Sequence, residues 1–166
     1  EQRMRAVVAQ VLDREPDAVI PWTGRQMAVA KFVPHLRNEH ALHRWDIAGD
    51  DDTSLDLLAE TALVEHSVDE LGHVLLVAGR EHDPDPNSDF HVRLRADGQR
   101  DLRVVVENGN AHLVWAVDDR DEPFVEIDAA ARQLFIWGRR PDARGRLHSH
   151  LRQPQLARLQ ALLSGY

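Results

Sequence analysis

The chain has 166 residues, of which 43% are hydrophobic and 29% are charged, and this balance predicts a folded core. It has no cysteine, which excludes a disulfide framework, a thiol nucleophile and a cysteine-ligated zinc site. A net charge of −8 argues against nucleic acid or an anionic membrane surface as a partner. Since no apolar run approaches the roughly 20 residues of a spanning helix and no signal peptide is recognisable, we expect a soluble, cytoplasmic protein.

Before residue 85, apolar residues recur at helical spacing and predict three amphipathic helices of the kind that pack in bundles. The first helix should end before Pro16, and a loop should follow through Pro21-Trp22-Thr23-Gly24. Its apolar stripe consists of Met4, Val7, Val8, Val11 and Leu12. Because this pattern is already established at Met4 and the chain begins with Glu1, we expect a further segment upstream.

The second and third helices are predicted with their boundaries. The second should run from about Gln26 to Ile47 and end at Gly49 and the acidic run 50–52. The third should begin at Thr53, with Asp56 completing a variant capping box, and should end at Gly79. The apolar positions of the third helix are Leu57, Val64, Val68, Leu71 and Leu75.

The segment 83–88 (Asp-Pro-Asp-Pro-Asn-Ser) has the composition of a linker, since it contains two prolines and no apolar residue. Beyond it, alternating patterns predict four strands at residues 90–95, 102–106, 112–117 and 124–127. Asn108-Gly109 is the strongest short signal for a hairpin. Asp128 should cap a helix over Ala129–Trp137 that ends at Gly138, and Pro154 should open a last helix.

These elements predict an α+β fold with a helical domain at 1–82, a linker at 83–88 and an α+β domain at 89–166. The strands should form an antiparallel sheet with the 129–137 helix packed on it. Because register decides which residues face inward, the alternation also predicts the core face of the sheet. That face should consist of Val92, Leu94, Val104, Val106, Trp115 and Val117.

One face of the second helix combines apolar and ionisable side chains. Its residues follow one another at spacings of 4, 3, 4 and 3, and they are Phe32, Leu36, Glu39, His43 and Asp46. Glu39 and His43 have the i, i+4 spacing with which two ligands on one helix can share a metal ion. The alternative is a hydrogen-bonded structural pair, which is common on helices. A third ligand would have to come from another helix.

Other motifs offer less. The chain has no dinucleotide-binding glycine motif, P-loop, zinc-protease helix or nucleophile elbow. His66 and His73 could face the bundle interior or solvent, while His148 and His150 lie in a polar connector. Arg139-Arg140 at a helix end is either a solvated cap or a pair that binds a carboxylate.

Two segments carry a resemblance to a known family. Asn38-Glu39-His40-Ala41-Leu42-His43-Arg44-Trp45-Asp46 resembles the Glu-x-x-x-His followed by Arg-Trp-Asp of the mycothiol-dependent maleylpyruvate isomerase family. Leu134-Phe135-Ile136-Trp137-Gly138-Arg139-Arg140-Pro141 resembles the family's Trp-Gly-Arg-Arg-Pro segment. The segments occur in the family's order, and the likeness extends from about Val7 to Leu163.

The resemblance implies a DinB-like four-helix bundle, here incomplete, followed by a domain similar to sterol carrier proteins. It implies a divalent metal, usually zinc, held by two His and one Glu. Glu39 and His43 match the Glu and the second His, whereas the first His belongs to an early helix that we expect upstream of Glu1. Asp46 would support the ligands. Arg139, with Arg140 beside it, would bind an anion and the thiol cofactor.

The function implied is that of a metal-dependent, mycothiol-using isomerase or thiol transferase of actinobacterial type that acts on a small organic acid. In that family the thiolate adds to the double bond of maleylpyruvate, the bond rotates, and elimination gives fumarylpyruvate. A bound metal would lower the pKa of the thiol. The alternative is a non-catalytic small-molecule binding protein of the same fold.

Three helices would leave the face with Phe32, Leu36, Glu39 and His43 uncovered, which is costly for apolar side chains. We therefore expect an upstream segment or a second copy of the chain to cover it. In the second case, His66 or His73 would be the helical candidates for the third ligand.

Overall fold

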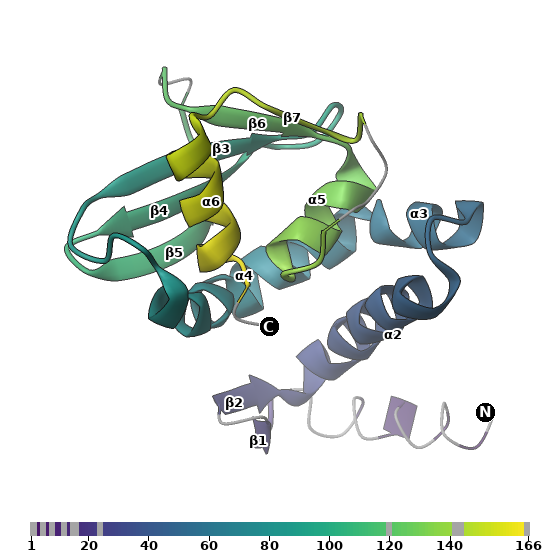
Figure 1. Cartoon of the computed structure of the whole chain (residues 1–166). Coiled ribbons are helices and arrows are strands. Elements are labelled where there is room, and N and C mark those ends of the chain that lie inside the picture. Colours follow the sequence, from purple (N-terminus) through teal and green to yellow (C-terminus); the bar gives the residue numbers. More distant parts are fainter. Residues whose placement is uncertain are drawn as a thin grey trace. The chain divides into compact units, whose positions relative to one another are not determined.

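A computed structural model of the chain describes residues 3, 6, 9–10, 13, 17–22, 25–118, 121–140 and 145–164 (Figure 1). The chain divides into two compact units, Glu1–His40 and Ala41–Tyr166. The apolar stripe expected between Met4 and Leu12 lies outside the described residues. Across the described part of the chain, no helix is long and apolar enough to cross a lipid bilayer.

The first unit contains a hairpin where a loop and the start of a helix were expected. Strands β1 (Val19–Trp22) and β2 (Arg25–Ala28) pair antiparallel, with Trp22 opposite Arg25. The prediction of a loop at Pro21-Trp22 is therefore wrong. The rest of that predicted loop, Thr23-Gly24, lies outside the described residues.

The second helix begins later than expected. After β2 comes a 3₁₀ turn, η1 (Val29–Lys31), and α2 runs over Phe32–Ala48. The predicted start at Gln26 is wrong because residues 26–28 belong to the β1–β2 ladder, and apolar spacing alone does not reveal a strand that continues into a helix. The end is confirmed, since Gly49 has φ +71° and its N–H donates to the Trp45 carbonyl at 2.8 Å.

The expected third helix is two helices, α3 (Asp52–Leu58) and α4 (Thr61–Gly79). Asp51, and not Thr53, caps α3 by accepting a hydrogen bond from the Ser54 N–H at 2.7 Å. The extended backbone of Glu60 (ψ 121°) interrupts the helical run. The predicted box of Thr53 and Asp56 is therefore wrong, because the apolar stripe continues through the break and hides it.

Five strands form one mixed sheet in the order β5-β4-β3-β6-β7. They are β3 (Phe90–Arg95), β4 (Leu102–Glu107), β5 (Asn110–Trp115), β6 (Phe124–Ile127) and β7 (Leu147–Ser149). Strands β3, β4 and β6 lie where the sequence predicts them, whereas β5 begins and ends two residues earlier than the predicted 112–117. The expectation of an antiparallel sheet is wrong for one pair, since β6 runs parallel to β3. Alternation specifies which face a residue occupies but not the direction of its neighbour. Strand β7 was missed because it is three residues long and contains His148 in its middle.

Helices α5 (Ala129–Ile136) and α6 (Gln153–Leu162) lie across one face of the sheet, and α4 packs against β5 (Figure 1). As predicted, Asp128 caps α5, accepting from the Ala131 N–H at 2.8 Å. The approach of α4 to β5 requires Gly72, because a Cβ there would lie 2.6 Å from the Leu113 carbonyl oxygen. Gly79 does end α4, and a Cβ there would lie 1.8 Å from the Leu162 carbonyl oxygen.

The core face of the sheet is largely as predicted. Val92, Leu94, Val104 and Val106 are all buried. Trp115 is half-buried, and Val117 is 83% exposed because β5 ends at Trp115. The buried positions of β5 are instead Ala111 and Leu113. They belong to the same alternating set as Trp115 and lie closer to the hairpin.

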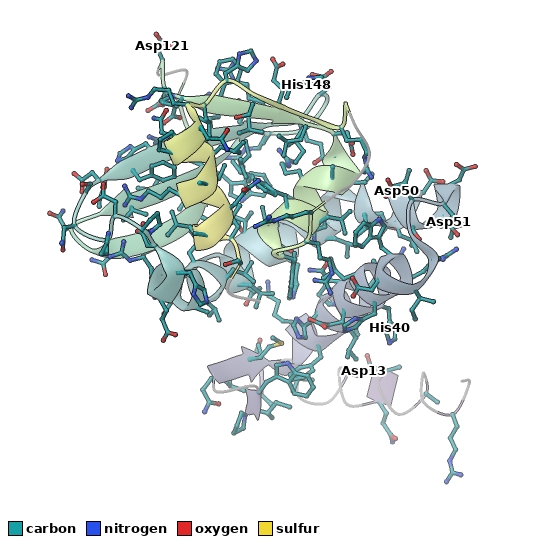
Figure 2. All side chains as sticks on the ribbon, viewed as in Figure 1. Asp13, His40, Asp50, Asp51, Asp121 and His148 are labelled. Carbon is teal, nitrogen blue, oxygen red and sulfur yellow. The ribbon has the colours of Figure 1, made fainter. Side chains whose placement is uncertain are left out.

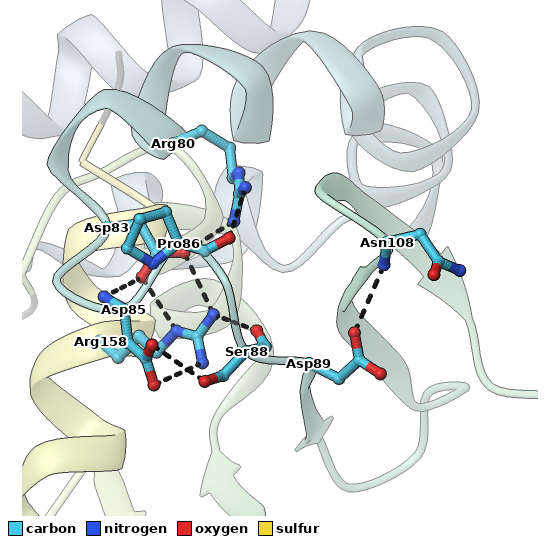
Figure 3. A network of polar contacts seen from close by, with 8 residues as sticks. All are labelled: Arg80, Asp83, Asp85, Pro86, Ser88, Asp89, Asn108 and Arg158. Atoms are coloured by element: carbon cyan, nitrogen blue, oxygen red, sulfur yellow. Dashed lines mark hydrogen bonds and ion pairs between the residues drawn. The ribbon is translucent and has the colours of Figure 1, made fainter.

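The proline-containing segment 83–88 is anchored by a buried carboxylate (Figure 3). Arg158 Nε donates to Asp83 Oδ1 at 2.9 Å, and Arg80 Nη1 donates to Asp83 Oδ2 at 2.8 Å. Arg158 Nη2 also donates to the Ser88 carbonyl at 2.7 Å. The segment is thus fixed to α6 at both of its ends. The domain division expected there does not coincide with the division between the two compact units, and as a statement about independently folding domains it stays a prediction.

Candidate functional site

Asp46 on α2 and Arg139 beyond the end of α5 form a bidentate ion pair. Arg139 Nε donates to Asp46 Oδ1 and Arg139 Nη2 donates to Asp46 Oδ2, each at 2.7 Å. A two-pronged arginine–carboxylate contact fixes orientation as well as distance. The turn that carries Arg139 is set by Gly138, whose φ of +74° favours glycine. Two residues from the two separate segments of the resemblance therefore meet in the second unit.

His43 extends this pair into a chain of three side chains. Its Nδ1 lies 3.0 Å from Asp46 Oδ2, and its ring is 63% exposed. The hydrogen bonds from Arg139 hold the pKa of Asp46 below its usual range; burial opposes this, and His43 adds to the lowering. Asp46 is thus an anion between two nitrogen groups, and it fixes the direction in which the His43 ring points.

Glu39 lies one turn before His43 on the same helix, in the first unit. Its Oε1 is 3.9 Å from His35 Nε2, and the His35 ring is almost fully buried. The Trp22 indole N–H donates to His35 Nε2 at 3.1 Å, and Phe32 packs edge-on against Trp22. At the beginning of α2, where the predicted face is apolar, the side chains thus pack around a buried histidine.

The donor set on α2 matches part of a metal centre. Glu39 and His43 offer a carboxylate and an imidazole at i, i+4, both ligand types of zinc. A ligating histidine commonly has its other ring nitrogen bonded to a carboxylate, which is the arrangement of His43 and Asp46. However, no group of three His, Asp or Glu side chains in the described ranges is arranged to hold a metal ion. Completing the set requires a ligand from elsewhere.

His35 is the residue that the sequence reasoning missed. With Glu39 and His43 it makes a His-x-x-x-Glu-x-x-x-His pattern on α2, with one ionisable side chain every four residues. That spacing was available as a signal. His66 and His73, the candidates expected from another helix, lie on α4.

The remaining candidates lie apart from this chain of side chains. Arg140 is exposed, and so is His40 on α2 (Figure 2). His66 is buried within α4, whereas the exposed His73 ring stacks on His112 with centroids 5.1 Å apart. His148 is exposed on β7 and does not belong to an irregular connector as expected.

The acidic run after α2 is also held by partners, at the corner labelled by Asp50 and Asp51 in Figure 2. Asp50 Oδ1 accepts from the Trp45 indole N–H at 2.6 Å and from Arg146 at 2.8 Å. Asp51 Oδ2 accepts from Arg44 at 2.7 Å. These contacts fix the end of α2 and hence the turn on which Asp46 lies.

The chain was compared with protein families and with curated proteins. No family model matches it, and no curated protein is significantly similar to it. Function therefore has to be inferred from the two short segments and from the geometry of the side chains they supply.

Proposed function

We propose that the protein is a metal-dependent, mycothiol-using isomerase or thiol transferase that acts on a small organic acid, with the fold of the maleylpyruvate isomerase family. In this proposal the helical part belongs to a DinB-like bundle and the sheet belongs to a sterol-carrier-like domain. The plain architecture, helices followed by a five-stranded mixed sheet with helices, is compatible with it.

The observation that supports the proposal is the pairing of Asp46 with Arg139. The two residues lie 93 positions apart, and each belongs to one of the two segments that resemble the family. Structural pairs of the same kind occur elsewhere in the chain, as between Arg158 and Asp83, so the support comes from the joining of these two particular segments. An active site would use such a contact, since catalytic groups need their positions fixed by further hydrogen bonds.

Each side chain has a distinct role in the proposal. Glu39 and His43 hold a divalent metal, zinc in the first instance, and a bound metal supplies the low thiol pKa that the chemistry needs. Asp46 keeps the His43 ring in its orientation through the 3.0 Å contact to Nδ1. Arg139 binds the organic acid, with Arg140 next to it. Because two of its donors contact Asp46, Arg139 would bind the substrate through its other donors or by exchanging partners.

The third ligand and the cover of the α2 face belong to the same proposal. Leu36 is 41% exposed and His43 is 63% exposed. Either a segment upstream of Glu1 or a second copy of the chain would cover them and bring a further histidine. Sedimentation of the purified protein, with and without added zinc, distinguishes the two sources.

A non-catalytic small-molecule binding protein is the second candidate. The observation that favours it is that Glu39 and His43 each lie beside a side chain of their own helix, His35 at 3.9 Å and Asp46 at 3.0 Å. These are the contacts expected of structural pairs. In this reading Arg139 still binds a carboxylate, but no metal and no thiol take part.

Metal analysis of the full-length protein, purified without chelator, tests the first proposal. We expect about one zinc per chain, as in a three-ligand catalytic site. Glu39→Gln and His43→Gln should each abolish retention, whereas His40→Gln, on the same helix and exposed, should retain the metal. Absence of zinc in the wild-type protein, or equal retention in all three variants, contradicts the metal site.

Turnover is measured separately from metal content. With mycothiol present, the zinc-loaded protein should isomerise maleylpyruvate, and Arg139→Gln should raise KM more than it lowers kcat, because it removes binding of the acid. If the protein retains zinc but gives no thiol-dependent turnover with a set of small unsaturated acids, the proposed metal site stands and the proposed reaction is refuted. A protein without zinc that still binds the acids would support the second candidate.

A further inference from the structure

Arg132, on α5, is a fully buried arginine with an incomplete set of partners. Its Nη1 donates to the Arg100 carbonyl at 2.7 Å, and its Nη2 donates to the Gln99 side-chain oxygen. Its Nε is buried without an acceptor among the described residues. Within that same part of the chain, no carboxylate forms a salt bridge with it, although Asp101 acts on it electrostatically. A buried guanidinium is costly unless an anion compensates it.

Burial lowers the pKa of Arg132 to about 10, with Asp101 acting in the opposite direction. The group therefore remains charged at neutral pH, and its charged form is destabilised by its surroundings. Asp101, the carboxylate that acts on it, is already engaged elsewhere, since it lies 3.4 Å from Arg93 Nη1 and 3.8 Å from Arg95 Nε. Any anion that reached Arg132 would stabilise it.

A small pocket leads to this side chain. Its volume is about 140 Å³, enough for several waters at ~30 Å³ each, and its lining includes Thr61, Glu65, Asp69, Arg100, Trp115 and Arg132. Arg132 is the one fully buried residue of the lining, and the others are exposed or half-buried. Arg132 thus lies on the inner wall of the pocket and is closed off from solvent. Trp115 offers an aromatic surface, and Arg100 lies over its ring at 4.8 Å.

The charges of the lining restrict what could bind. Arg100 and Arg132 are balanced by Glu65 and Asp69, and Asp69 accepts the Trp115 indole N–H at 2.9 Å. A dianion such as phosphate would meet two carboxylates as well as two guanidinium groups. A monoanion with a short apolar tail would be repelled less, and its tail could lie against Trp115. None of these residues belongs to the Glu39, His43, Asp46 and Arg139 set.

We propose that this pocket is a binding site for a small monocarboxylic acid, whose carboxylate accepts hydrogen bonds from the buried Arg132 and whose apolar part contacts Trp115. The site is separate from the proposed metal centre and does not depend on it. A ligand here would also hold the loop of Gln99 and Arg100 against α5, since Arg132 contacts both.

Titration of the protein with propionate, followed by the ¹H–¹⁵N signals of the Trp115 indole and the Arg132 Nε–H, tests the proposal. We expect saturable shifts of both signals. Arg132→Gln should remove the shift of the indole signal, whereas Arg152→Gln, an exposed arginine at the start of α6, should leave both shifts unchanged. Ethylamine, which has the same apolar tail and an opposite charge, should give no saturable shift.

A second variant keeps the test decisive if Arg132→Gln does not fold. Glu65 is exposed on α4, so Glu65→Gln should fold and should tighten propionate binding by about 1.5- to 5-fold, the range of a partly exposed charge interaction. Glu81→Gln, exposed and outside the pocket, is its matched control. Absence of saturation with propionate, tighter binding of inorganic phosphate than of propionate, or equal affinity in Glu65→Gln and the wild type would overturn the proposal.

Discussion

Asp46 and Arg139 share two hydrogen bonds of 2.7 Å across 93 positions of the sequence. The pair is one-third exposed on its carboxylate side and one-fifth exposed on its guanidinium side. It therefore connects α2 to the turn after α5 without being sealed from solvent. Such a pair can hold a geometry and still be opened by a competing anion.

The strength of this pair is our first prediction. A double-mutant cycle of Asp46→Asn and Arg139→Gln should give a coupling of about 0.5–1 kcal/mol in the free energy of unfolding, the upper part of the range for partly exposed pairs. Urea unfolding of the four proteins measures it. A coupling indistinguishable from zero would mean that the bidentate contact is not maintained in solution.

The dependence of stability on pH is the second prediction. The pKa of Asp46 is lowered by Arg139, and that of Asp128 is lowered because hydrogen bonds from Arg146 and the start of α5 outweigh burial. A carboxyl with a depressed folded-state pKa contributes stability above its unfolded pKa of about 3.9 and loses it as pH falls through the folded value. Unfolding free energy should thus fall below about pH 5. Asp46→Asn should reduce the difference between pH 6 and pH 3, and an unchanged difference would contradict the assignment.

The third prediction concerns the buried hydroxyl of Ser67. Its Oγ accepts from the Trp137 indole N–H and from Gln133 Nε2, each at 2.9 Å, and donates to the Leu63 carbonyl. Ser67→Ala removes an acceptor shared by two buried donors and should cost about 1–3 kcal/mol in unfolding free energy. The exposed Ser164 supplies the matched control, since Ser164→Ala should change stability by less than about 0.5 kcal/mol. Equal effects would show that Ser67 is not needed as an acceptor.

The fourth prediction concerns two glycines, one constrained by a close backbone contact and the other by its positive φ. Gly79→Ala should cost on the order of 3 kcal/mol, because its Cβ would meet backbone of α6 at 1.8 Å. Gly49→Ala should cost about 1 kcal/mol, because only its φ of +71° opposes a side chain and no atom lies within 4 Å. Thermal unfolding of both variants checks the ranking. A smaller loss for Gly79→Ala would mean that α6 does not lie against α4.

Strands β3 to β6, the hairpin between β4 and β5 and the cap of α5 were predictable because their signals are local. Asn108 and Gly109 both have positive φ, as their hairpin signal requires, and Asp128 caps α5 as its position indicates. The break between α3 and α4 was not predictable from the apolar stripe, which continues across it. The direction of β6 also depends on a partner more than 25 residues away, and no local pattern encodes it.

The candidate site was predictable only in part. The α2 spacing suggested Glu39 and His43, and the resemblance suggested Arg139, but neither revealed that Arg139 contacts Asp46. Buried charges were missed altogether. Arg93, Arg132 and Arg158 are read from sequence as surface residues, because burial of an arginine depends on partners that the fold brings from elsewhere.

The parallel pairing of β3 with β6 has a kinetic consequence. The meander of β3, β4 and β5 closes through short hairpins and can form early, whereas β6 reaches β3 only after the chain has passed the whole meander. Until then β3 is an open edge with unpaired backbone groups, and β7 has no strand on which to add. We therefore expect the slow step of folding to be the docking of β6 and β7. A refolding intermediate would have a three-stranded sheet in which the backbone groups along the β3 edge are unpaired and prone to association.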